Sequence, residues 1–115
     1  MKIAVLSTKG WGYDADPVTT VLGDLLPALG DRAGTYVVTD YFDGTAGRTA
    51  RQFWAGYGGG VITIHPDGDD QVLSALLAEK PDDFLLFAGE GDTKEAKAIE
   101  KAVKKAGIPL RIITQ

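Results

Sequence analysis

The sequence predicts an α/β fold in which helices cover both faces of a parallel sheet. Five short aliphatic runs lack the alternation of half-exposed strands, and such continuous runs are typical of strands buried on both faces. Four segments with apolar residues at helical spacing separate the runs, and strands that alternate with helices form β-α-β units. We therefore expect a five-stranded, three-layer α/β/α architecture, and the length of 115 residues fits one domain over positions 1–115.

The first half of the chain supplies two strands and two helices. Lys2 to Ser7 (KIAVLS) is the first strand. Asp16-Pro17 provides an N-cap and a first helical residue, and Val18 to Leu29 continues with apolar residues at helical spacing. Thr35 to Thr39 (TYVVT) is the second strand, and Arg48 to Tyr57 is the second helix.

The second half of the chain continues the alternation. Three glycines at 58–60 end the second helix, and Val61 to Ile64 (VITI) follows as the third strand. Asp67 to Ala78 predicts a helix that begins with acidic residues, and Phe84 to Phe87 (FLLF) predicts the fourth strand. Leu110 to Ile113 is the fifth strand. Periodicity leaves two strand orders open, a Rossmann-like 3-2-1-4-5 and a flavodoxin-like 2-1-3-4-5.

The last helix has the clearest pattern. Asp92 followed by Glu95 has the spacing of a capping box, and Gly107 ends the helix. Residues 94–115 carry six basic and two acidic side chains, so the total charge of −4 leaves −8 on the rest of the chain. A chain this acidic lacks the broad basic face that nucleic acids need, and we expect no nucleic-acid partner. The lysines are interpreted as a solvated helix face, with contact to a polyanion as the alternative.

Composition excludes several kinds of site. The chain has no cysteine, which excludes disulfides, thiolate metal sites and a cysteine nucleophile. Its single histidine, His65, gives no histidine pair to a metal and is interpreted as structural. No apolar run approaches the roughly 18 residues of a spanning helix, and the start MKIAVLSTKG lacks the apolar stretch of a signal peptide. We expect a cytoplasmic protein with no membrane segment, no metal and no cofactor.

Glycine is in excess, with 15 residues against about 8 expected from a usual frequency of roughly 7 per cent. Ligands of open α/β sheets bind beyond the carboxyl ends of the strands. Six glycines fall in loops at that edge: Gly10, Gly12, Gly44, Gly47, Gly89 and Gly91. Glycine there lets backbone N–H groups approach an anion. Neither a G-x-G-x-x-G motif nor a phosphate loop is present, so tight turns are the alternative interpretation.

Side chains in the same loops are candidate site residues, each with two interpretations. Lys9 pairs with a phosphate or is solvated. Trp11 and Tyr13 stack on a base or ribose, or they pack back onto the core. The three carboxylates between Glu90 and Glu95 suit acid–base chemistry or a divalent ion, or they are the ordinary acidity of a helix start. Among them, the Asp92 carboxylate would compete with a phosphate at the helix start.

Four stretches share a recognisable motif order: Ser7 to Trp11 (STKGW), Gly44 to Ala55 (GTAGRTARQFWA), Ala88 to Thr93 (AGEGDT) and Ala106 to Pro109 (AGIP). In this order they resemble the SLOG superfamily of Rossmann-like nucleotide-binding domains, in its small YspA-like branch, which is related to LOG/lysine-decarboxylase-like and DprA domains. The resemblance covers nearly the whole chain. It implies the strand order 3-2-1-4-5, a nucleotide-related ligand at the carboxyl edge of the sheet, and a homodimer.

The resemblance also implies a set of ligand-binding residues: Thr8, Lys9, Gly10, Trp11, Gly44, Thr45, Gly89, Gly91 and Thr93. Ala88, Glu90 and Asp92 depart from it, because they stand where the family's loop has a proline and two glycines. Members that cleave N-glycosidic bonds carry a Glu three residues after the loop's threonine, where this chain has Ala96, with Glu95 one residue early. The altered positions are those that hold phosphate and perform the reaction, so the resemblance implies binding without efficient turnover.

Three functions stay open at this point. The leading hypothesis is a protein that binds a nucleotide, nucleoside or NAD-derived small molecule without efficient turnover. The second is an N-glycoside hydrolase that acts on nucleoside monophosphates, with Glu95 or Glu90 as its catalytic carboxylate. The third is a protein-interaction module, such as a small phage or accessory protein.

Overall fold

The computed structural model describes residues 1–12, 15–29, 34–41, 46–68 and 71–114. Its strands are β1 (Lys2–Ser7), β2 (Tyr36–Thr39), β3 (Gly60–Thr63), β4 (Asp83–Ala88) and β5 (Leu110–Thr114). Its helices are α1 (Asp16–Leu29), α2 (Ala46–Gly56), α3 (Val72–Ala78) and α4 (Thr93–Lys105). Strand and helix alternate along the chain as the sequence predicts, and each strand agrees with its predicted bounds to within one residue.

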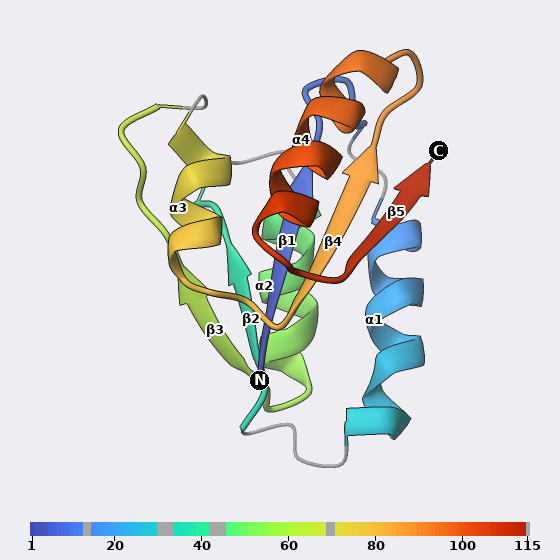
Figure 1. The fold of residues 1–115 in the computed structure, drawn as a ribbon. Coiled ribbons are helices and arrows are strands. Elements are labelled where there is room, and N and C mark those ends of the chain that lie inside the picture. Colours follow the sequence, from blue (N-terminus) through green and yellow to red (C-terminus); the bar gives the residue numbers. More distant parts are fainter. Residues whose placement is uncertain (13–14, 30–33, 42–45, 69–70, 115) are drawn as a thin grey trace.

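The five strands form one parallel sheet in the order β3-β2-β1-β4-β5 (Figure 1). The predicted α/β fold class is therefore confirmed, and so is the order 3-2-1-4-5; the flavodoxin-like order is not found. The chain first adds β2 and β3 on one side of β1 and then crosses to add β4 and β5 on the other. The strand order reverses at the β1–β4 pair, which is where ligands of open α/β sheets commonly bind.

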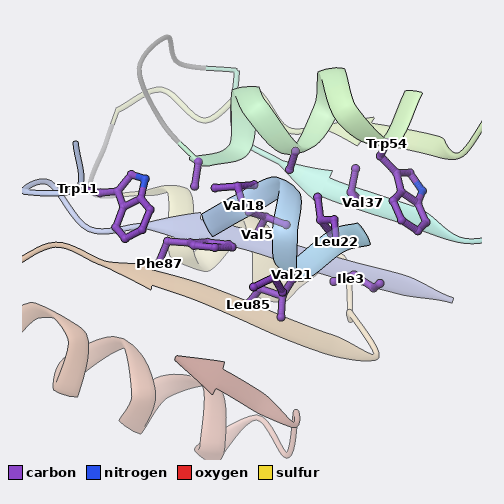
Figure 2. Close-up of a cluster of buried hydrophobic side chains, with 12 residues drawn as sticks. Ile3, Val5, Trp11, Val18, Val21, Leu22, Val37, Trp54, Leu85 and Phe87 are labelled. Atoms are coloured by element: carbon purple, nitrogen blue, oxygen red, sulfur yellow. The ribbon is translucent and has the colours of Figure 1, made fainter. Parts of the chain in front are cut away.

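Two hydrophobic clusters, one on each face of the sheet, make the core. The first packs α1 and α2 against Ile3 and Val5 of β1, and the second packs α3 and α4 against Ala4 and Leu6 of the same strand. Figure 2 shows the first cluster, with Trp11 and Trp54 at its opposite ends. Because successive side chains of a strand point to opposite faces, the unbroken run of apolar residues in β1 supplies both clusters. In Figure 1, α4 crosses in front of β1.

Helix α3 corrects one prediction. It begins at Val72, not at Asp67, with Gln71 as its N-cap residue. The Gln71 N–H donates to the Gly68 carbonyl at 3.0 Å, ahead of the helix. The exposed Asp67 lies before α3 and is not part of it, and Asp69 and Asp70 lie outside the described residues. The apolar stripe over α3 is correct, and only its acidic start is wrong.

The glycines after α2 have a packing role besides ending the helix. Trp54 is fully buried, and its Nε1–H donates to the Thr35 carbonyl at 3.0 Å. The backbone at Gly59 crosses so close to this ring that a Cβ there would lie 2.0 Å from Nε1. Gly58 has a φ of +80°, in the left-handed region that favours glycine. The turn thus lets the chain pass directly over the indole on its way into β3.

Among the described residues, no helix has the length and hydrophobicity to cross a bilayer.

We expect Gly59→Ala to lower the free energy of unfolding by about 1–3 kcal/mol, because the added methyl group overlaps the buried Trp54 ring. Gly56→Ala is the matched control: a Cβ at this last residue of α2 meets nothing within 4 Å, and alanine should raise stability by about 0.5–1 kcal/mol. Urea denaturation measures both. Equal effects of the two substitutions would contradict the close approach at Gly59.

Candidate functional site

The loop after β1 and the loop after β4 meet at the carboxyl edge through Thr8. Its side chain is only 3% exposed, and its Oγ1 accepts a hydrogen bond from the Gly89 N–H at 2.8 Å. The same hydroxyl donates to Asp92 Oδ2 at 2.5 Å. One hydroxyl of the loop after β1 thus contacts both ends of the loop after β4, at the point where the strand order reverses.

Asp92 and Glu95 bring two carboxylates onto the backbone of the loop after β1. The Gly10 N–H donates to Asp92 Oδ2 at 2.7 Å, and the Lys9 N–H donates to Glu95 Oε2 at 3.3 Å. Successive backbone N–H groups of this kind form an anion-binding concavity. Here the anions are the chain's own side chains, which lie at the N-terminus of α4, where the helix dipole also favours negative charge.

The predicted capping box is wrong in its bonds, although Asp92 does occupy the N-cap position. The Asp92 side chain makes no cap hydrogen bond to α4. It turns instead to Thr8 and Gly10, and Glu95 turns to the Lys9 N–H. The spacing along the chain is right for a box, but donors from a loop far away in sequence take both carboxylates.

Three of the edge glycines are explained by close contacts within the chain. A Cβ at Gly10 would lie 2.5 Å from Asp92 Oδ2, and a Cβ at Gly47 would lie 2.9 Å from Asp40 Oδ1. A Cβ at Gly89 would lie 2.3 Å from the backbone of Gly10. Glycine does let anions approach this edge, as the sequence suggests, but two of these glycines make room for the chain's own aspartates.

A second group of polar residues lies at the ends of β1 and β2. Asp40 is 3% exposed, and its carbonyl accepts a hydrogen bond from Arg51 Nη1. The N–H of Ala46, the first residue of α2, donates to Ser7 Oγ at 3.1 Å. Thr39 is fully buried, and its Oγ1 has no hydrogen-bond partner among the residues that the structure describes.

The other predicted ligand residues divide by exposure. Trp11 is 6% exposed and packs edge-on against Phe87 at a centroid distance of 5.4 Å, which is the core-packing alternative. Exposed positions are Lys9, Gly10, Glu90, Gly91 and Thr93. Thr8 and Gly89 are buried at the junction described above. Tyr13, Gly44 and Thr45 lie outside the described residues.

Sequence reasoning missed an aromatic pair at the same edge. The rings of Tyr41 and His65 lie 5.0 Å apart with an interplanar angle of 35°. Both are exposed, Tyr41 by 42%. Each stands two residues beyond Thr39 and Thr63, which are paired in the β2–β3 register. This equal offset could have revealed the pair once β2 and β3 were known to be neighbours. His65, interpreted as structural from the sequence, is a surface residue.

Comparisons with protein-family models, with curated proteins and with solved structures found no match to this chain. The SLOG resemblance therefore stays a hypothesis that its own motif residues carry. Within the described ranges, no group of three or more His, Asp or Glu side chains lies together in a way that could hold a metal ion.

We expect Thr39→Val to raise the free energy of unfolding by about 1 kcal/mol, because it replaces an unpartnered buried hydroxyl with a methyl group of similar shape. Thr8→Val is the matched control at a second buried threonine. It should lower stability by about 1–3 kcal/mol, since it breaks the bonds to Gly89 and Asp92. Urea denaturation of both variants measures these changes in the free energy of unfolding. A loss of stability in Thr39→Val would contradict the account and indicate a bound water or ligand at Oγ1.

Proposed function

We propose that the chain binds a nucleoside-like small molecule at the carboxyl edge of its sheet, without efficient turnover, and that the base stacks on the Tyr41–His65 pair. The exposed aromatic pair carries this proposal, because planar rings on loops at this edge offer the surface that a nucleobase needs. Stacking of a base on an aromatic side chain contributes about 1–3 kcal/mol. The wider class includes nucleotides and NAD-derived compounds, which carry the same base and sugar.

The charges at the edge favour the nucleoside part of such a ligand over its phosphate. The Lys9 and Gly10 N–H groups, which would hold a phosphate, already donate to Glu95 and Asp92. Two carboxylates at this place also repel a further anion. A third carboxylate, that of Asp40, lies close to Gly47 near the start of α2. We therefore expect a nucleoside to bind at least as tightly as its monophosphate.

The carboxylates are also better suited to holding the loops than to cleaving a glycosidic bond. An N-glycoside hydrolase needs a carboxylate aimed at its substrate. Glu95 and Asp92 instead accept hydrogen bonds from the loop after β1, and Glu90 is exposed. Binding without turnover is the function that these contacts support best. Release of free base from a nucleoside monophosphate, abolished by Glu95→Gln, would reverse this preference.

Calorimetric titration with adenosine, guanosine, cytidine and uridine, and with their monophosphates, tests the proposal. We expect at least one nucleoside to bind, and we expect Tyr41→Ala to weaken it by about tenfold or more through the loss of stacking. Tyr57→Ala is the matched control, because Tyr57 is an exposed tyrosine, 49% accessible, that follows the far end of α2. The control should bind as the unchanged protein does.

Two results would overturn the proposal. One is the absence of binding across the whole panel. The other is binding that Tyr41→Ala and His65→Ala leave unchanged, since the ligand would then lie elsewhere.

A further inference from the structure

Helix α4 presents a row of lysines on the side opposite its buried face. Ala96, Ile99 and Val103 of this helix pack in the core. All of its lysines are exposed: Lys94, Lys97, Lys101, Lys104 and Lys105. At 3.6 residues per turn these five positions fall within an arc of about 100° and extend over about 16 Å of the helix. We call this surface the lysine row.

Acidic residues of the helix do little to neutralise the lysine row. Lys104 pairs with Glu100 at 3.7 Å, and Glu95 is turned to the Lys9 N–H. The other four lysines of the row make no ion pair with any residue that the structure describes. Positive charge is therefore concentrated on one face of a chain whose residues 1–93 carry a net charge of −8.

Helix stability does not account for the whole row. Lys104 and Lys105 lie in the last turn, where a positive charge interacts favourably with the helix dipole. Lys94 lies in the first turn, where the dipole opposes it. Lys97 and Lys101 are four residues apart, as are Lys101 and Lys105, and like charges at this spacing destabilise a helix. Part of this arrangement of lysines therefore destabilises α4, and a partner of opposite charge would offset that cost.

We infer that the lysine row binds a short acidic segment of a partner polypeptide, whose carboxylates lie along α4. Between positions 94 and 105 there is no arginine and no aromatic residue, so the row lacks the side chains that stack on single-stranded bases. The acidic remainder of the chain repels a long polyanion such as duplex nucleic acid. The apolar face of α4 is buried in the core, so the helix cannot insert that face into a lipid surface.

A short acidic segment fits where those partners do not. It needs only the roughly 16 Å of the row, and charge alone holds it, so the interaction should weaken steeply with salt. This inference is independent of the proposed nucleoside site, because the two use different residues.

Fluorescence anisotropy with a labelled ten-residue glutamate peptide tests the inference, at about 20 mM and about 150 mM salt. A triple variant, Lys94→Gln, Lys97→Gln and Lys101→Gln, should weaken binding by about tenfold or more at the lower salt. The matched control replaces the same three lysines with arginine, keeps the charge and should stay within about threefold of the unchanged protein. Circular dichroism verifies that all variants are folded.

Amide NMR shifts on peptide addition should be confined to α4. Peptide binding that the glutamine variant retains would overturn the inference, as would shifts that map to another surface. Tighter binding of single-stranded DNA or of vesicles with anionic lipid, at equal salt, would assign the row to a different partner class and reject the acidic segment. Light scattering that shows a dimer lost in the glutamine variant would assign the row to a second copy of this chain.

Discussion

The carboxylate of Asp92 is the contact on which the carboxyl edge of this sheet depends. It accepts hydrogen bonds from the Thr8 hydroxyl and the Gly10 N–H, and Thr8 in turn accepts one from the Gly89 N–H. These bonds join the loops after β1 and β4 at the point where the strand order reverses. The absence of side chains at Gly10 and Gly89 is what lets the two loops and the carboxylate come together. Side chains and backbone groups of the chain itself therefore fill the space between the loops after β1 and β4.

This closure divides the edge into two parts with different chemistry. Over β1 and β4, carboxylates of the chain take the backbone donors that would otherwise bind an anion. Over β2 and β3, the Tyr41–His65 pair stands exposed beside the buried Thr39 and Asp40. The proposed ligand, which stacks on the aromatic pair and is not held through phosphate, follows from this division. The lysine row on α4 lies on the outer face of a helix and does not depend on this division.

Local sequence patterns are sufficient to predict the fold class and the succession of strands and helices, but they leave two strand orders open. Continuous apolar runs such as Lys2 to Ser7 predict buried parallel strands, and helical spacing predicts the elements between them. The site was harder, since its contacts join distant positions: Gly10 and Asp92 are 82 residues apart, and no spacing rule connects them. The capping-box prediction failed for this reason. Tyr41 was missed because its contact with His65 depends on β2 and β3 being neighbours.

The most direct measurement of the central claim follows the Lys9 and Gly10 amides by NMR while inorganic phosphate is added. Because Asp92 and Glu95 already accept these two N–H groups, the account predicts no saturable shift of either amide in the unchanged protein. In Asp92→Ala the Gly10 donor loses its partner, and its amide should shift as phosphate binds. A saturable shift of the Gly10 amide in the unchanged protein, with the same affinity as in the variant, would contradict the account.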